Sequence, residues 1–478
     1  MQFFTIAFFA LVTAVFIAVK LGNTFIKTEK TRITFANAVI LAASYAFVIY
    51  ADYRFALALA ALTVVTWFCA KKDKLIPLGI VLAVVSLGFF KYTNFFIESF
   101  AKLFGNDFTA LKLIVPLGVS FYTFSAVSYL ADVRRQKVQA DSLFSVALYL
   151  AFFPKLTSGP IQRSGDFLQQ ANSDRSVGLD SFKTGVQIFV FGLFKKLVLA
   201  DRLAVFVDQV YATPNVFGSL TVLLAVIAYS FQIYLDFSGY SDMAVGVAKI
   251  IGFDLPRNFN LPYLAHNVTE LWKRWHISLS SWLMEYLYFP LGGSRKGTFR
   301  NYLNLVLTMV IGGIWHGANR TYVFWGLLHG VALAVHKVWM KLTKSAERKP
   351  GIAGSLISIV LTFAFTSFCW IFFRAESFES ATAIITRMFS FSAGLEQPYL
   401  WLFVTLALYF AAAAFAVVKS RKNADNVKLK KQNVCRVEGF YPVLNLSKFW
   451  QLTLFFVFLG LTLVTAYTGG SPFIYGNY

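Results

Sequence analysis

A series of long apolar segments constrains the fold of this chain more than any other feature. The 478-residue sequence is 57% hydrophobic and 18% aromatic, and only 14% of its residues are charged. A soluble domain carries roughly 25% charged residues. Because a helix needs about 20 mostly apolar residues to cross a bilayer, the composition predicts an all-α, multi-pass membrane protein.

Several apolar segments are too short to cross a bilayer alone, and we interpret these as re-entrant or interfacial pieces, which require protein or a water-filled cavity around them. We therefore predict roughly eleven crossings together with buried half-helices. No internal repeat of the transporter kind is evident. The candidate segments are Phe3–Val19, Phe35–Ile49, Phe55–Ala70, Leu75–Phe90, Leu113–Leu130, Ser145–Phe153, Gly185–Leu199, Leu220–Tyr234, Met243–Ile251, Leu303–Ile314, Val323–Trp339, Ile357–Phe373, Tyr399–Val418 and Trp450–Tyr467.

The net charge of +21 indicates membrane orientation rather than nucleic-acid binding, because the basic residues occur in short loops between apolar segments. If the most basic loop, 419–436, is cytoplasmic, the last span leads outward and the tail 468–478 lies outside the cell. Three cysteines without paired spacing predict no disulfide framework and no metal site. The other loops expected on the cytoplasmic side are 71–74, 134–137, 195–196 and 294–296.

The stretch Thr269–Gly330 holds three of the five histidines, His276, His316 and His329. Its first half is aromatic and charged, which favours a helix lying at the membrane interface from Thr269 to Pro290. Within that helix we expect an ion pair between Glu270 and Arg274. The spacing also predicts that five side chains share one face, namely Trp272, Trp275, Leu279, Trp282 and Tyr286.

His316 lies in the apolar second half of this stretch, and an ionisable residue at membrane depth is a candidate functional residue. The residue could form a hydrogen bond between helices, relay protons or act as a catalytic base. Gly312-Gly313 permits a tight backbone approach or a helix break beside it. Since no serine–histidine–aspartate or cysteine–histidine pattern is visible, direct transfer with the histidine as base is favoured over a protein nucleophile next to it.

Other polar or proline-containing segments interrupt the apolar pattern. The segment Gln232–Asp242 carries two aspartates, two serines and two tyrosines, and it requires a structural hydrogen-bond network or a water-filled cavity. Pro116–Tyr122 and Phe153–Pro160 predict broken helices.

These motifs together resemble the membrane-bound O-acyltransferases. The similarity is greatest to the bacterial branch that acetylates alginate, peptidoglycan and cellulose, and the D-alanyl transferase of teichoic acid synthesis is a more distant relative. The resemblance covers Val115–Phe378 and the tail. It is carried by PLGVSFYTF, FPKLTSGPIQR, QIYLDFSGYSDMAVG, NFNLPYLAHNVTELWKRWHISLSSWL, YLYFPLGGSRKG, GGIWHGANRTYVFWGLLHG and WIFFRAESF.

The resemblance implies one membrane domain, residues 1–478, with core motifs in 115–378 and a helical ring around a central funnel. It also implies that His316 is the catalytic histidine and His276 a second functional histidine. Acetyl-CoA is then a donor substrate arriving from the cytoplasm, and no permanently bound cofactor is expected. Met284-Glu285 replaces the usual Arg-Asp of relatives and Arg320 a common aromatic residue, which we expect to alter local pairing without loss of the chemistry.

Further site residues follow from the implied chemistry. Trp315, Asn304 or a freed backbone N–H near Gly312-Gly313 is a candidate for stabilising the oxyanion, and Asp236 and Ser238 are candidates for lining the tunnel. Four cations are candidates for binding the donor phosphates: Lys273, Arg274, Arg295 and Lys296.

The tail predicts a covalent relay, in which Tyr475, or second Tyr478, receives the acyl group at His316 and passes it to a partner. The alternative is that its aromatic residues only anchor the tail. The implied partner is a secreted or anchored esterase-like (SGNH-type) protein that acetylates an extracytoplasmic polysaccharide. The implied location is the bacterial cytoplasmic membrane, with the C-terminus outside. The alternatives are transfer of D-alanyl or another acyl group from a carrier-protein thioester, a lipid-linked sugar transporter, and a non-enzymatic scaffold.

Overall fold

A computed structural model describes residues 3, 5–105, 111, 113–175, 177–343, 351–397, 399–424, 441 and 443–469. Throughout these residues the regular structure is helical, apart from an isolated bridge between Phe217 and Leu395. The predicted all-α class is therefore confirmed. The ring and funnel implied by the resemblance stay predictions.

The chain divides into two compact units, and each unit is assembled from three separate parts of the sequence. Unit 1 comprises Met1–Phe191, Tyr240–Arg257 and Val437–Phe456. Unit 2 comprises Gly192–Gly239, Asn258–Arg436 and Val457–Tyr478. The single domain predicted for residues 1–478 stays a prediction.

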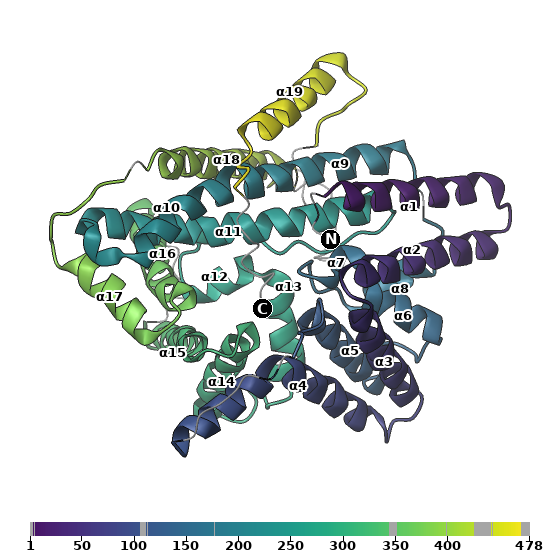
Figure 1. Ribbon diagram of the computed structural model, residues 1–478, viewed down its shortest axis with the longest axis horizontal. Helices are drawn as coiled ribbons and strands as arrows, with labels where there is room; N and C mark the ends of the chain where they lie inside the picture. Colours follow the sequence, from purple (N-terminus) through teal and green to yellow (C-terminus); the bar gives the residue numbers. More distant parts are fainter. Residues whose placement is uncertain are drawn as a thin grey trace. The chain divides into compact units, whose positions relative to one another are not determined.

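Unit 1 begins with a hairpin of long helices, α1 and α2, which lie side by side (Figure 1). Helix α3 packs against α5 and α6, and α4 packs against α5. Thr5 caps α1 and Asp52 caps α3 through side-chain oxygens that accept backbone N–H groups. The helices are α1 (Ile6–Phe25), α2 (Glu29–Ala51), α3 (Tyr53–Ala70), α4 (Ile76–Leu103), α5 (Val119–Arg134), α6 (Leu143–Ala151), α7 (Phe153–Leu156), α8 (Ser164–Ala171) and most of α9 (Leu179–Leu193).

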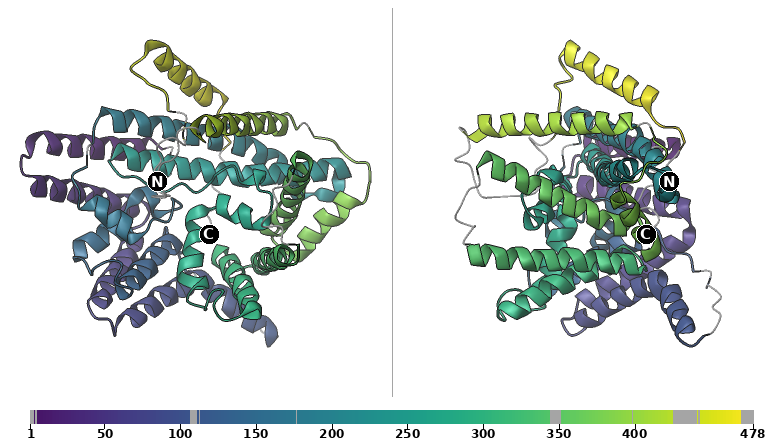
Figure 2. Two further views of the ribbon diagram at one scale, coloured as in Figure 1. Left: turned by 180° about the vertical axis from the view of Figure 1, so that it is seen from behind. Right: turned by 90° about the vertical axis from the view of Figure 1, so that its left-hand side faces the viewer.

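Unit 2 contains the conserved-looking central stretch of the sequence and is built around the pair α14 and α15 (Figure 2). Its elements are the π-helix η1 (Phe194–Ala200), α10 (Asp201–Ala212), η2 (Pro214–Val216), α11 (Ser219–Ile250) up to Gly239, η3 (Pro262–Leu264), α12 (Val268–Arg274), α13 (Ile277–Leu283), the π-helix η4 (Met284–Tyr288), α14 (Thr298–His316), α15 (Arg320–Thr343), α16 (Ile352–Arg374), α17 (Phe378–Phe389), α18 (Leu400–Ala424) and the end of α19 (Phe449–Thr465).

Seven of the helices in the described part of the chain are long and apolar enough to cross a membrane, and α18 and α19 contain shorter apolar helices. The protein is therefore a multi-pass membrane protein, while the predicted count of roughly eleven crossings stays a prediction. The chain is non-helical just before Val119 and after Leu156, as Pro116 and Pro160 predicted.

Three predictions about individual elements were wrong. Leu220–Tyr234 and Met243–Ile251 are not separate segments, because α11 continues through the polar residues between them. The interfacial helix is broken at Trp275-His276 and capped by Asn267 rather than Thr269, so its five large side chains do not share one helical face. Lys196 does not lie in a loop, since it belongs to η1 and its side chain is buried.

The glycines of the α14–α15 pair serve a close backbone approach, not a helix break. Helix α14 continues through Gly312 and Gly313 to His316. A Cβ on Gly313 would lie 2.3 Å from the carbonyl oxygen of Tyr322, and one on Gly326 would lie 2.4 Å from that of Met309. Real Cβ atoms do not approach backbone so closely, so both positions require glycine for α14 and α15 to pack.

Gly326→Ala should therefore destabilise the protein by about 1–3 kcal/mol, since a backbone carbonyl cannot yield as a side chain can. The measurement is the thermal unfolding midpoint of the purified full-length protein in detergent. Gly88→Ala is the matched control, because a Cβ at Gly88 in α4 meets nothing within 4 Å. Equal midpoints for the two variants would contradict the close approach at Gly326.

Candidate active site

His316 is the last residue of α14, and aromatic rings enclose its imidazole. Only 3% of the residue is exposed. The imidazole centroid lies 4.9 Å from the Trp315 ring, 5.1 Å from Phe373 and 5.3 Å from Trp325. The sequence thus places an ionisable ring in apolar surroundings contributed by α14, α15 and α16.

The turn after His316 is fixed by its side chains. Asn319 accepts a hydrogen bond from the backbone N–H of Thr321 at 3.0 Å, and its amide donates to the carbonyl of Glu376 at 2.8 Å. A Cβ on Gly317 would lie 2.6 Å from the ring of Tyr322. The tight turn between α14 and α15 therefore holds His316 against the end of α16.

His276, the second predicted histidine, lies at the break between α12 and α13. Its φ of +40° is in the left-handed region, which costs a residue with a Cβ roughly 1–2 kcal/mol. Asn258 supports the break, because its carbonyl accepts the N–H of Ile277 at 2.9 Å and its side chain accepts the Ser278 hydroxyl at 2.6 Å. Such maintained strain is typical of functional sites.

The two histidines belong to the same aromatic cluster. The His276 ring lies 4.6 Å from Phe237 and 6.4 Å from Trp315, which also contacts His316. Within the described part of the chain, neither ring nitrogen of His276 has a hydrogen-bond partner. Burial lowers the pKa of His276 to about 3, so its imidazole is uncharged at neutral pH.

His329 of α15 is a third histidine in this cluster, and sequence reasoning gave it no role. It is fully buried, and its ring lies 5.1 Å from Trp325, 5.2 Å from Trp272 and 5.5 Å from Phe365. Trp325 therefore separates His316 from His329. The spacing of four residues between Trp325 and His329 on one helix was the signal that could have indicated the contact.

Asp236, a predicted tunnel residue, is instead part of a buried ion cluster. Lys196 Nζ lies 2.6 Å from Asp236 Oδ1 and 2.7 Å from Asp201 Oδ1, and all three side chains are at most 3% exposed. Burial raises the pKa of Asp201 to about 6, although Lys196 opposes the shift. Ser238, the other tunnel candidate, is buried with a hydroxyl that has no partner among the described residues.

Gly239 allows the ion cluster to form. A Cβ there would lie 2.7 Å from the carbonyl of Gly192 and 3.1 Å from the backbone nitrogen of Lys196, so α11 passes close to η1. Further along α11, the hydroxyl of Tyr441 donates to Asp242 at 2.6 Å. The polar residues of α11 thus form the structural network that the sequence left open as one of two alternatives.

The remaining oxyanion candidates differ in what the structure leaves available. Trp315 is buried between the two site histidines. The amide of Asn304 donates to the carbonyls of Leu291 at 3.2 Å and Gly293 at 3.0 Å, so its hydrogens already hold the loop before α14. The N–H groups of Gly312-Gly313 lie within a continuous helix.

The four predicted phosphate-binding cations lie on exposed or partly exposed parts of unit 2. Arg274 bonds Glu270 at 2.7 Å, which confirms that ion pair, and also donates to the carbonyl of Asn260. Lys273, Arg295 and Lys296 are exposed. The described residues contain no cluster of potential metal ligands. Tyr475, Tyr478 and residues 425–436 of the basic loop lie outside the described residues, as do the side chains of 419–424.

Comparison with known proteins identifies the family. Residues 5–375 match the MBOAT, membrane-bound O-acyltransferase family. The chain belongs to this family. The O-acyltransferase suggested by the sequence motifs is therefore confirmed, and the histidine-centred aromatic cluster lies within the matched region.

The curated relatives span several acyl acceptors. The chain is 38% identical over 392 residues to the probable alginate O-acetylase AlgI of Pseudomonas aeruginosa, which covers 79% of this chain and 73% of that protein. It is 40% identical over 339 residues to the peptidoglycan O-acetyltransferase of Helicobacter pylori, covering 65% and 64%. Similarity to the teichoic acid D-alanyltransferase of Bacillus subtilis is 28% over 279 residues, covering 56% and 71%.

Lys196→Met should strongly destabilise unit 2, because Asp201 and Asp236 are then buried together without their cation. Breaking such a pair costs about 3–5 kcal/mol. Thermal unfolding of the purified protein measures the loss. Lys196→Met combined with Asp236→Asn should regain part of it, while a double variant no more stable than the single one would argue against the ion cluster as the cause.

Proposed function

We propose that this protein transfers an acetyl group from acetyl-CoA to a hydroxyl group, as a step in the O-acetylation of an extracytoplasmic polysaccharide. The observation that carries the proposal is the buried, aromatic-enclosed His316 in a chain of the O-acyltransferase family. The acetyl group and the polysaccharide acceptor are suggested by the printed functions of the alginate and peptidoglycan relatives.

His316 acts in this proposal as a general base. An imidazole nitrogen accepts the proton of the acceptor hydroxyl while the hydroxyl oxygen attacks the thioester carbonyl. The carbon–sulfur bond then breaks, and the CoA thiolate leaves with that proton. Because both partners react directly, the step requires no acyl-enzyme at His316 and no metal ion.

His276 is proposed to stabilise the oxygen on which negative charge develops. An uncharged imidazole presents one N–H donor, and in a water-poor aromatic site a fixed donor is worth more than in water. Trp315 contacts both histidines and could fix their relative orientation. Asn304 supports the adjacent loop instead, since its amide hydrogens are already engaged.

The donor is proposed to enter from the cytoplasm. Exposed Lys273, Arg295 and Lys296, together with Arg274, offer charge to the phosphates of CoA. Under the positive-inside rule the basic loop 419–436 is then cytoplasmic, so the chain lies in the cytoplasmic membrane of a bacterium with its C-terminus outside.

The final acceptor step is proposed to involve the tail and a separate protein. Tyr475, or else Tyr478, would receive the acetyl group and pass it to an esterase-like (SGNH-type) partner outside the membrane. A phenolate is a better leaving group than a sugar alkoxide, because the phenol pKa is near 10. D-alanyl transfer from a carrier-protein thioester is the alternative that the Bacillus subtilis relative supports.

His316→Asn should reduce thioester consumption by about 100- to 10,000-fold, the usual contribution of a general base. Liquid scintillation of radiolabelled acetyl-CoA, with the full-length purified protein and an alcohol acceptor, measures the rate. His266→Asn is the control, since His266 pairs with Glu270 at 2.9 Å outside the aromatic cluster. Unchanged consumption by the folded His316→Asn protein would refute the assignment, and consumption of D-alanyl carrier thioester alone would favour the alternative donor.

Tyr475→Phe separates the relay from simple anchoring of the tail. It keeps the aromatic ring but removes the hydroxyl, so it should abolish acetyl label on the tail and acetylation of the cell-surface polymer. Peptide mass spectrometry and base-released acetate measure the two quantities. Full polymer acetylation by Tyr475→Phe, with Tyr478→Phe tested in parallel, would exclude a relay through Tyr475.

A further inference from the structure

Unit 1 contains a buried lysine whose amine has no anionic partner. Lys155 is the third residue of the four-residue helix α7 and is 4% exposed. Within the described residues no hydrogen-bond acceptor and no carboxylate lies within bonding distance of its Nζ. Buried charges are normally paired, so this amine is a candidate for binding something that the chain does not supply.

The backbone around Lys155 is packed too closely to let the side chain leave. A Cβ on Gly159 would lie 2.5 Å from the Lys155 Cα, and one on Gly118 would lie 2.3 Å from the carbonyl oxygen of Leu156. Pro154 begins the short helix. The position of the amine is therefore set by the fold.

Aromatic rings stabilise a positive charge at this position. Lys155 Nζ lies 3.8 Å from the centroid of the Tyr149 ring and 4.7 Å from that of Phe167. Both distances are within the range of cation–π attraction, which strengthens in desolvated surroundings. The cage favours an ammonium but offers it no hydrogen-bond acceptor.

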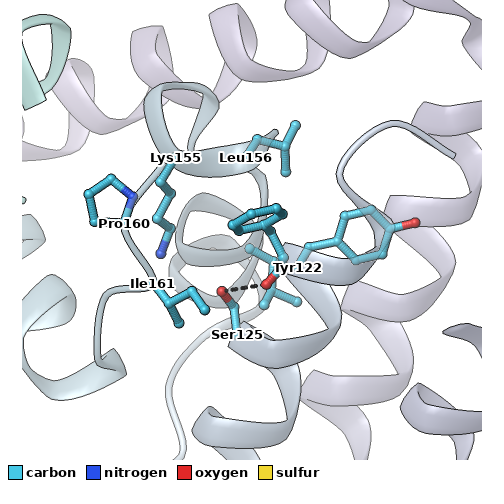
Figure 3. A pocket seen from close by; sticks show the side chains of 8 residues that line it. Tyr122, Ser125, Lys155, Leu156, Pro160 and Ile161 are labelled. Atoms are coloured by element: carbon cyan, nitrogen blue, oxygen red, sulfur yellow. Dashed lines mark hydrogen bonds between the residues drawn. The ribbon is translucent and has the colours of Figure 1, made fainter. Parts of the chain in front are cut away.

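A small cavity adjoins the amine. Figure 3 shows the Lys155 side chain pointing toward Ser125 and Ile161. The cavity measures about 10 Å³, which is room for roughly one water-sized atom beside the nitrogen. Its walls are mostly apolar, and the Ser125 hydroxyl is committed to the carbonyl of Phe121 at 3.1 Å. The lining residues are Phe121, Tyr122, Ser125, Leu150, Lys155, Leu156, Pro160 and Ile161.

We propose that this pocket binds a small monocarboxylate such as acetate, with one carboxylate oxygen in the cavity accepting a hydrogen bond from Lys155. One donor and space for one atom fit a single acceptor oxygen, whereas a phosphate group needs several donors. The apolar walls at Leu156, Pro160 and Ile161 suit the alkyl end of the acid. The inference is independent of the His316 chemistry.

Binding of the carboxylate should take up a proton. Burial lowers the pKa of Lys155 well below its usual value, so the amine of the empty pocket is uncharged, and the carboxylate restores the ammonium by pairing with it. The nearby titratable groups are the phenols of Tyr122 and Tyr149, with Asp132 and Arg163 acting on Tyr149. Since neither phenol supplies a negative charge at neutral pH, the carboxylate is the counterion, and binding should weaken as pH rises.

Equilibrium dialysis of the full-length protein against radiolabelled acetate tests the site. Wild type should bind one acetate per chain with a dissociation constant on the order of 1 mM, well within the limit for a ligand of four heavy atoms. Lys155→Met removes the amine but keeps the packing, and should weaken binding at least tenfold. Lys183→Met, a partly exposed lysine of unit 1, should bind as wild type does.

Competitors and calorimetry complete the test. Acetamide, which has the same shape without charge, and chloride, which has no alkyl group, should each compete at least tenfold more weakly than propionate. Titration of wild type in two buffers of different ionisation enthalpy should reveal uptake of about one proton per acetate. No saturable binding, equal binding by folded Lys155→Met, equal competition by acetamide, or no proton uptake by wild type would each overturn the proposal.

Discussion

The enclosure of His316 by aromatic rings is the constraint on which the rest of unit 2 depends. Trp325 and Phe373 come from α15 and α16, and Trp315 precedes the histidine on α14. An imidazole in such surroundings is shielded from water, so it remains available to a hydroxyl group that enters the site. Trp315 extends the same cluster to His276, whose strained backbone is held by Asn258.

This enclosure requires helices that approach each other more closely than ordinary side chains permit. Gly313 and Gly326 bring α14 and α15 together, and Gly239 brings α11 to η1. The second approach buries Lys196 with Asp201 and Asp236. Charge and packing are therefore linked in unit 2, because the glycine that permits the approach also places a carboxylate beside the lysine.

The sequence was sufficient for the helical class, for the family and for the choice of His316, because a lone histidine in an apolar, motif-bearing segment has few explanations. It was insufficient for contacts between residues distant along the chain. Lys196 resembled a loop cation until Asp236, forty residues away, was seen beside it. The break at His276 was also missed, since the tryptophan spacing is helical and the interruption depends on Asn258. His329 has no local signal beyond its spacing from Trp325.

The most direct test of the account is transfer across a membrane by the reconstituted protein. Vesicles would carry labelled acetyl-CoA on the side of the basic loops and a hydroxyl acceptor, with the partner protein, on the other side. The account predicts that label appears on the acceptor side with wild type and not with His316→Asn, while both proteins insert equally. Equal transfer by the two proteins would contradict the central role of His316.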